Sequence, residues 1–424
     1  MKRFFFPLAL FAFLLFSCSN KPHTIVVWSD KAEIASYIEK FNVEQDKVRA
    51  ILIYKERPAT SLPPVEDEEK PDVIVGSFLK NSSVRKNFAP LDSILGERDE
   101  NGNLSAKKLD SKSFYDSLLD FGKDGEKQYL LPISFNLPII AFSQKNESFV
   151  QNPHTIEIEE IKNAAESFNT KNSKGIYTHM GFAPSWNADF IYEAAKMGGA
   201  EFMEIGRSFG WNMTALERTV EFMRNWTTEK NTSSTAETDF SFKYLYSPPY
   251  KQIATGRCLF IYSTTNTFFS LAPEQIADAD FRWLTKDGEI FVEDNLTTAG
   301  IFRTSHKKEE SKAFLRWLLK SETQQELLNR AEEMHLGTRS FGICGGFSSL
   351  KEVNEWYFPA HYKTLLGNLP GEESIITPLP LPPRWESLKM RVLIPYLSDA
   401  TRTELPYKMR TIDERLKIWT KQFN

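Results

Sequence analysis

Apolar runs and helical periodicity alternate along the first part of the chain. Two runs rich in β-branched residues, 24–28 and 48–54, flank a segment whose apolar residues recur at helical spacing, which predicts a strand, a helix and a second strand. Asp30 followed by Glu33 resembles a capping box, which would start the helix directly after the first strand. A third run, 72–76, is apolar on both faces, as a central parallel strand is. These elements indicate an α/β lobe with a parallel sheet.

The next part of the chain begins with a long extended segment, residues 128–142, which Pro132 and Pro138 interrupt. A single central strand would not tolerate two prolines, so this segment is expected to cross from one lobe to another. Beyond it, the apolar pattern predicts a second set of helices and strands. The expected helices are 155–168, 187–197, 214–226, 308–320 and 411–423, and the expected strands are 257–262, 281–284 and 299–302.

We therefore predict an α/β fold of two lobes joined by a hinge, in which each lobe is assembled from discontinuous segments. The length of 424 residues exceeds what one packed core accommodates. The first lobe is expected to comprise residues 23–134 and 296–345, and the second lobe residues 135–295 and 346–424.

The N-terminus has the pattern of a bacterial export signal. Two basic residues precede an apolar run at 4–16, which is too short to span a bilayer, so residues 1–17 are expected to be a cleaved signal peptide. Residues 15–18, Leu-Phe-Ser-Cys, fit a lipobox apart from the bulky phenylalanine. Acylated Cys18 would then begin the mature chain and anchor the exported protein to the membrane through a short tether, residues 18–22. The alternative is a plain signal peptide with an incidental cysteine.

Composition argues against several classes of protein. Lys and Arg number 52 and Asp and Glu 56, a formal net charge of −4, and no long basic block is present, so nucleic-acid binding is not expected. The phosphate-binding loop, His-Glu-x-x-His, Gly-x-Ser-x-Gly and Cys-x-x-Cys motifs are absent, and the 6 histidines are scattered. We accordingly expect neither an enzyme nor a bound metal or other cofactor. Cys258 and Cys344 are too few for a disulfide framework, although they could form one bridge.

Several segments, in their order along the chain, resemble one protein family. They are Trp28-Ser-Asp30, 70–76, 88–95, Leu131-Pro-Ile-Ser-Phe-Asn136, 254–261, and 299–308 running into 313–324. The family is the extracellular solute-binding proteins of ABC importers, specifically the sugar-binding group that includes maltose-binding protein. The resemblance covers most of residues 24–330, whereas residues 340–400 match no pattern of the family.

The resemblance implies two α/β lobes that enclose a ligand and close about a hinge. It also implies a sugar or oligosaccharide as the small-molecule ligand, captured without chemical change. ABC permease subunits in the membrane would be the partners that receive it. We expect the binding protein itself to be a monomer and, given the lipobox, a lipoprotein.

The candidate site residues come from the loops that follow the strands, because ligands of parallel sheets lie beyond the carboxyl ends of the strands. A sugar offers apolar faces and a rim of hydroxyls, which aromatic rings and hydrogen-bonding polar side chains recognise. The candidates are Trp28, Ser29, Asp30, Ser77, Phe78, Asn136, Trp186, Asn187, Ser263 and Asn266.

An indole, of Trp28 or Trp186, is expected to stack on a neutral sugar, while three polar side chains bond its hydroxyls. Those three are Asp30, Asn136 and Asn266. No arginine cluster stands in these loops, which argues against a phosphate or a polyanion as ligand. Some candidates have structural alternatives: Trp28 could be the last inward residue of its strand, and Asp30 and Asn187 could be helix caps.

Two other functions fit parts of the sequence. The unmatched region 340–400 would suit a surface lipoprotein with the same fold but a degenerate cleft, acting as an adhesin or a structural protein. An exported hydrolase with an Asp/Glu pair is the third hypothesis, for which abundant carboxylates are the one supporting feature. Closure upon ligand binding would separate the first two functions, and turnover of a bound ligand would identify the hydrolase.

Overall fold

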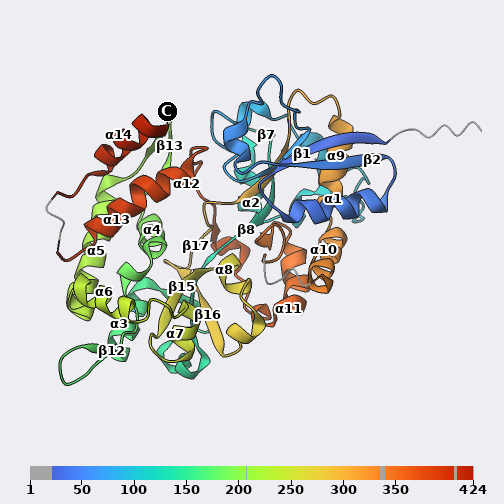
Figure 1. Cartoon of the computed structure of the whole chain (residues 1–424). Helices are drawn as coiled ribbons and strands as arrows, with labels where there is room; N and C mark the ends of the chain where they lie inside the picture. The colour runs from blue at the N-terminus through green and yellow to red at the C-terminus, as the bar shows by residue number, and fades with distance from the viewer. Residues whose placement is uncertain (1–21, 207, 335–339, 405–407, 424) are drawn as a thin grey trace, which may run out of the picture.

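The computed structural model describes residues 22–206, 208–334, 340–404 and 408–423. It has two lobes, each built around a sheet, and the chain passes between them more than once (Figure 1). The blue N-terminal strands and the orange helices form one lobe, whereas the green helices and the red C-terminal helices form the other. The predicted two-lobed α/β fold is thus confirmed.

The first lobe is built on a six-stranded sheet. Its strand order is β19 (Phe347–Ser348), β8 (Leu131–Phe135), β18 (Thr297–Ile301), β3 (Val73–Gly76), β1 (His23–Ser29) and β2 (Val48–Tyr54). β1 pairs in parallel with both β2 and β3, and α1 (Glu33–Glu44) connects β1 to β2, as the apolar pattern predicts. β18 pairs antiparallel with β3 and with β8, so a strand from late in the chain separates two early ones.

The start of α1 differs from the prediction. Its N-cap is Ala32, which makes no side-chain capping bond, and Asp30 lies two residues earlier in a bend. The capping box predicted from Asp30 and Glu33 is therefore wrong, because the chain bends once more before the helix begins. The carboxylate of Asp30 takes no part in starting α1.

The second lobe contains a four-stranded sheet in the order β10 (Thr155–Glu157), β16 (Ala279–Thr285), β9 (Pro138–Ser143) and β15 (Phe260–Thr264). β9 pairs antiparallel with β15 and β16. The segment with the two prolines crosses between the lobes as predicted, since Pro132 lies in β8 and Pro138 begins β9. The helix expected from residue 155 begins only at Ile158, because residues 155–157 pair with β16.

The remaining elements complete the two lobes. The helices are α2 (Asp116–Phe121), α3 (Ile158–Phe168), α4 (Ala188–Met197), α5 (Met213–Asn231), α6 (Ser234–Lys243), α7 (Pro249–Ala254), α8 (Thr265–Phe269), α9 (Lys308–Leu318), α10 (Ser321–Glu333), α11 (Phe358–His361), α12 (Trp385–Leu388), α13 (Ile394–Ala400) and α14 (Ile412–Phe423). Short two-stranded pairs are formed by β4 (Leu95–Gly96) with β5 (Leu109–Asp110), β6 (Lys123–Asp124) with β7 (Lys127–Gln128), β11 (Thr170–Lys171) with β12 (Tyr177–His179), β13 (Met203–Ile205) with β14 (Ser208–Gly210), and β17 (Ile290–Phe291) with β20 (Ile375–Ile376). Among the helices of the described residues, none combines the length and the apolar character that crossing a bilayer requires.

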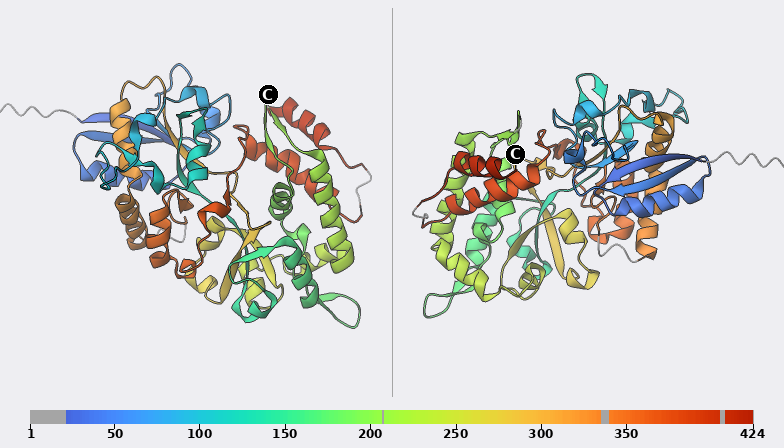
Figure 2. Two further views of the ribbon diagram at one scale, coloured as in Figure 1. Left: turned by 180° about the vertical axis from the view of Figure 1, so that it is seen from behind. Right: turned by 45° about the horizontal axis from the view of Figure 1, so that its top comes forward.

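Two large apolar clusters stabilise the lobes. The first packs on one face of the six-stranded sheet and continues through Leu137 to Ile139 and Trp283 of the second sheet. The second cluster fills the other face of the second sheet and includes the buried Trp385 and Trp419 of the C-terminal helices. In both views of Figure 2 these red helices lie against the green helices of the second lobe. Because the first cluster contains residues of both sheets, apolar packing is continuous across the crossover.

The exact division of the chain into lobes stays a prediction. β19 begins two residues beyond the boundary that we placed after residue 345, and it pairs with β8 in the first sheet. The helices from α12 onward pack in the apolar cluster of the second sheet.

The substitution Gly300→Ala should destabilise the first lobe. A Cβ atom at position 300, in β18, would lie 2.5 Å from Cδ1 of Phe88 and 2.9 Å from Cδ2 of Leu130. Overpacking of this kind costs about 1–3 kcal/mol of the free energy of unfolding, which urea denaturation would measure. In a Phe88→Leu background the substitution should cost less, because the ring is gone. An equal cost in both backgrounds would contradict the packing explanation.

Candidate functional site

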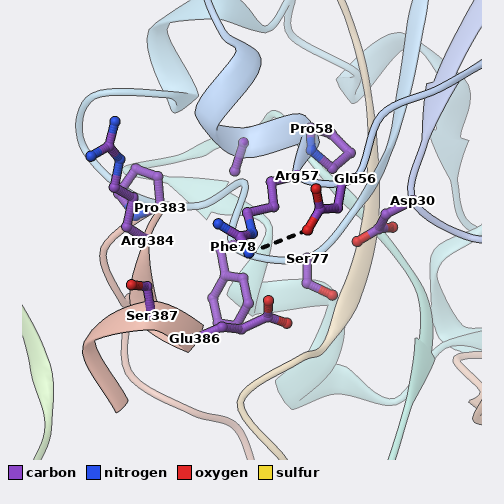
Figure 3. A pocket seen from close by; sticks show the side chains of 11 residues that line it. Asp30, Glu56, Arg57, Pro58, Ser77, Phe78, Pro383, Arg384, Glu386 and Ser387 are labelled. Atoms are coloured by element: carbon purple, nitrogen blue, oxygen red, sulfur yellow. Dashed lines mark hydrogen bonds and ion pairs between the residues drawn. The ribbon is translucent and has the colours of Figure 1, made fainter. Parts of the chain in front are cut away.

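A cavity lies between the lobes, with a volume of about 340 Å³ that includes space open to solvent. The side that belongs to the first lobe, here called the first wall, comprises Asp30, Glu56, Arg57, Pro58, Ala59, Ser77 and Phe78. The second wall, from the second lobe, comprises Pro383, Arg384, Glu386 and Ser387. Figure 3 shows the labelled side chains of the two walls around the cavity.

The first wall is formed by the loops at the carboxyl ends of three neighbouring strands. Asp30 follows β1, residues 56–59 lie in the connection after β2, and Ser77 and Phe78 follow β3. Since β1 is parallel to both of its neighbours, these strand ends meet at one edge of the sheet, where ligands of α/β folds bind. Three of the predicted site residues thus line the cavity.

The carboxylate of Asp30 faces the cavity with little compensation. Its Oδ1 atom is buried and accepts no hydrogen bond from any described residue, and Lys31 Nζ lies 3.9 Å away. Burial raises the pKa of Asp30, the charge of Lys31 opposes this, and the negative charge of Glu386 on the second wall adds to the rise. A group that brings a hydrogen-bond donor to Asp30 would therefore be stabilised there.

The other charged groups of the cavity are exposed, and each of the two arginines makes one hydrogen bond to the protein. Arg57 Nη2 donates to Glu56 Oε1 at 3.3 Å, and Arg384 donates to a backbone carbonyl of α14. The carboxylate of Glu386 makes no hydrogen bond to a described residue. The cavity thus keeps its acceptors, Asp30 and Glu386, available to a ligand.

Phe78 supplies an aromatic ring at the junction of the lobes. Its backbone has a φ of 60°, a conformation that side-chain-bearing residues rarely adopt, and its carbonyl accepts from Asn81 Nδ2 at 2.6 Å. The ring packs against apolar side chains of both lobes, yet the residue remains partly exposed. It therefore offers an apolar surface to a ligand between the walls.

The two predicted residues that precede Asp30 do not line the cavity. Trp28 is 0% exposed, and Lys55 Nζ lies 4.5 Å from the centroid of its ring. Ser29 is also buried, and its Oγ accepts from the backbone N–H of Lys31 at 3.0 Å. Trp28 packs in a third, smaller apolar cluster, on the face of the first sheet opposite the first cluster, which is the structural alternative for this residue.

Trp186 and Asn187 also lie outside the cavity lining. Trp186 stacks on Phe240, with ring centroids 5.4 Å apart and planes at 17°, and its Nε1–H donates to the carbonyl of Glu237 at 3.2 Å. Asn187 is the N-cap of α4, where its Oδ1 accepts from the backbone N–H of Asp189 at 2.9 Å. The helix-cap alternative for Asn187 is thus confirmed.

The last three candidates lie near the β8–β9 crossover and likewise do not line the cavity. Asn136 Nδ2 donates to the carbonyl of Gly345 at 2.7 Å, and its Oδ1 accepts from Thr265 Oγ1 at 2.8 Å. Ser263 Oγ donates to the carbonyl of Thr264 at 3.3 Å, and Asn266 Oδ1 accepts from Ser270 Oγ at 3.2 Å and from the backbone N–H of Phe341 at 3.3 Å. Their part in ligand binding stays a prediction.

No residue of the second wall is among the sequence-predicted site residues. Arg384 and Trp385 rank below the others in the sequence, because a tryptophan near a proline-rich loop more often packs that loop down. Arg384 and Glu386 fall in the region 340–400, which resembles no pattern of the family. The usable signal was Trp385 between them, since a tryptophan flanked by charged residues fits a short helix with one face buried and the other open to solvent.

A cluster of buried charges lies directly behind the second wall. It comprises Glu193 and Lys196 of α4, Glu293 and Asp294 between β17 and β18, and Lys389, which follows α12. Lys196 Nζ lies 3.0 Å from Glu193 Oε2 and 3.3 Å from Asp294 Oδ1. Within the part of the chain that the structure describes, no group of three or more His, Cys, Asp or Glu side chains is arranged to hold a metal ion. Lys196 and Lys389 are the positively charged members of this cluster.

The carboxyl groups of the cluster differ in protonation. Burial raises the pKa of Glu193 to about 8, against the opposing charge of Lys196. Burial acts in the same direction on Asp294, but the charges of Lys196 and Lys389 and two side-chain hydrogen bonds outweigh it and lower the pKa. At neutral pH Glu193 is then largely protonated, whereas Asp294 is ionised.

The family model of bacterial extracellular solute-binding proteins matches residues 65–325, which is more than half of the chain. The chain belongs to this family. The resemblance seen in the sequence is thereby confirmed, and the family is one of extracellular binding proteins. No curated protein matches the sequence closely enough to be called a relative.

Solved structures of solute-binding proteins share the fold. CpMnBP1 with mannotriose bound has a TM-score of 0.59 and 14% identity, covering 94% of this chain and 99% of that chain. The cyclic α-maltosyl-1,6-maltose binding protein from Arthrobacter globiformis has a TM-score of 0.59 and 14% identity, covering 93% and 96%. A cyclo/maltodextrin-binding protein complexed with maltotetraose has a TM-score of 0.59 and 15% identity, covering 96% and 99%. At such identities the likeness establishes the fold of this solute-binding protein.

The substitution Glu193→Gln should make the stability of this solute-binding protein less dependent on pH. A carboxyl group with a pKa of about 8 when folded and near 4.5 when unfolded holds its proton more tightly in the folded state, so its contribution to stability falls as the pH rises between these values. The amide cannot ionise, so the variant lacks this loss. Thermal melts at pH 5 and pH 8 should show a smaller fall in Tm for the variant than for the wild type.

The matched control is Glu221→Gln, which changes an exposed carboxylate of α5. Its Tm should change with pH as that of the wild type does. The same fall in Tm for Glu193→Gln and for the wild type would contradict the protonation of Glu193.

Proposed function

We propose that the protein is the sugar-binding component of an ABC importer, which captures an oligosaccharide between its lobes and delivers it to permease subunits in the membrane. The observation that carries the proposal is the cavity between the lobes, where the Asp30 carboxylate and the Phe78 ring face the second wall. The protein performs no chemistry on its ligand in this proposal.

The polar groups of the cavity favour a neutral ligand rich in hydroxyl donors. Asp30 and Glu386 offer acceptors, whereas Arg57 and Arg384 already donate to protein groups. Three carboxylates and two arginines line the cavity, so a phosphate or a polyanion would meet an excess of negative charge there. Sugar hydroxyls can donate to both carboxylates at once, which a neutral apolar ligand cannot do.

The aromatic component of the proposed site is Phe78 and no longer Trp28 or Trp186. Trp28 is buried and Trp186 stacks on Phe240 away from the cavity lining, whereas Phe78 lies at the junction and lines the cavity. An aromatic ring with adjacent acceptors matches the apolar face and the hydroxyl rim of a sugar. The mannotriose, cyclic maltosyl-maltose and maltotetraose ligands named for the solved structures of this fold support the same substrate class.

A cavity lined by a carboxylate whose burial Lys31 offsets only in part speaks against the degenerate-cleft alternative. Burial and the charge of Glu386 both make the ionised form of Asp30 costly. A protein that used this fold only as an adhesin would gain stability by replacing such a residue. The cost is explained if Asp30 meets hydroxyl donors of a ligand.

The substitution Phe78→Ala should weaken binding of the preferred oligosaccharide. Loss of one ring from the centre of a binding site costs on the order of 2 kcal/mol, which is about thirtyfold in Kd. Calorimetry against a panel of mono- and oligosaccharides would identify the ligand and measure the loss. Phe242→Ala is the matched control, because Phe242 is 73% exposed on α6 and does not line the cavity. Binding of an amino acid, a peptide or a metal by the wild type would contradict the substrate class, and an unchanged affinity in Phe78→Ala would contradict the site.

Membrane attachment is proposed to occur through Cys18, which lies outside the described residues. Two acyl chains on the added glycerol would give the double anchor that stable attachment needs. In detergent phase partitioning, the wild type should enter the detergent phase and Cys18→Ala should stay in the aqueous phase. If both forms remain aqueous, the chain is not anchored in this way.

A further inference from the structure

The segment 293–295, which runs toward β18, contacts both walls of the cavity. The carbonyl of Asn295 accepts a hydrogen bond from Ser77 Oγ of the first wall at 2.8 Å. The neighbouring Asp294 accepts at Oδ2 from Nε1–H of Trp385 at 2.7 Å. Trp385 stands between Arg384 and Glu386, so its indole is attached to the second wall. Two consecutive residues thus hold opposite walls.

Segment 293–295 is also hydrogen-bonded to the β8–β9 crossover and to β15 of the second sheet. The backbone N–H of Glu293 donates to the carbonyl of Asn136, which lies between β8 and β9, at 2.9 Å. Glu293 Oε1 accepts from the hydroxyl of Tyr262 in β15 at 3.2 Å. Segment 293–295 is therefore connected to the first wall, the second wall and the neighbouring crossover at once.

The hydrogen bond from Trp385 to Asp294 has two features that strengthen it, a buried environment and an ionised acceptor. The side chain of Asp294 is 8% exposed and Trp385 is 0% exposed, so water does not compete effectively for either group. Burial raises the pKa of Asp294, but Lys196 and Lys389 outweigh burial and keep the carboxylate ionised. A hydrogen bond to an ionised acceptor is stronger than one between neutral groups.

We propose that segment 293–295 sets the spacing of the two walls, and that Asp294 is the positioning residue that holds the second wall through the Trp385 indole. Asp294 does not line the cavity and need not touch the ligand. Its effect on affinity arises because a ligand that spans both walls requires them at the correct separation. The inference concerning affinity depends on the proposed sugar binding, whereas the inference concerning wall spacing does not.

The substitution Trp385→Phe removes the indole N–H and keeps an aromatic ring in the core. Tyr192→Phe is the matched control, because the Tyr192 hydroxyl donates to the same Oδ2 atom at 2.6 Å but belongs to α4, outside the cavity lining. Each variant loses one hydrogen bond to Asp294, and both should lower the Tm. If Asp294 had only a structural role, the two variants would therefore lose sugar affinity to the same extent.

Calorimetry with the sugar that the wild type prefers should show affinity about tenfold weaker for Trp385→Phe and within about twofold of wild type for Tyr192→Phe. Asp294→Asn is the second variant if Trp385→Phe does not fold, and it should also weaken binding about tenfold. Equal affinity losses in Trp385→Phe and Tyr192→Phe, or none in either, would overturn the positioning role of Asp294.

Small-angle scattering of the ligand-free protein is the readout that does not require a sugar. Trp385→Phe should have a broader distribution of interatomic distances than the wild type, and Tyr192→Phe should match the wild type. If the wild type binds no sugar of the panel, the proposed function fails. The scattering measurement still tests whether segment 293–295 sets the spacing of the two walls. Identical distributions for all three proteins would overturn the role of segment 293–295 in wall spacing.

Discussion

The rest of this structure depends on one constraint: the chain crosses repeatedly between two sheets that share one apolar cluster. The chain leaves the first sheet after β8, returns as β18, and leaves again after β19. Polar backbone groups at such crossings must find partners, and Asn136 and Glu293 bond the crossings to each other. The cavity lies beside these crossings. There the strand ends of the first sheet face residues 383–387, which pack on the second lobe.

The strand and helix pattern of the first lobe was predictable because it follows from short-range periodicity. The order of β1, α1, β2 and β3 and the crossing between Pro132 and Pro138 were all present in local patterns. The rule that ligands lie at strand ends then found Asp30, Ser77 and Phe78. It could not tell which aromatic residue near those ends faces inward, so it also selected Trp28, which packs in the core.

The second wall could not be predicted because its place depends on long-range packing. Glu386 comes within electrostatic reach of Asp30 only because Trp385 is fixed in the apolar cluster of the second lobe and bonded to Asp294. The burial of the charged cluster could not be predicted from the sequence for a related reason. Glu193 and Lys196, three residues apart, have the spacing of an ordinary surface pair on a helix, yet both are buried against the segment between β17 and β18.

The position of β18 also governs when the first lobe can fold. β18 separates β3 from β8, and its pairing with β3 joins residues more than 200 positions apart in the chain. Until residues 297–301 have been synthesised, β3 has an unpaired edge and the six-stranded sheet cannot be completed. Contacts of such high sequence separation slow folding. The first sheet is therefore completed only after β9, β15 and β16 of the second sheet have been synthesised.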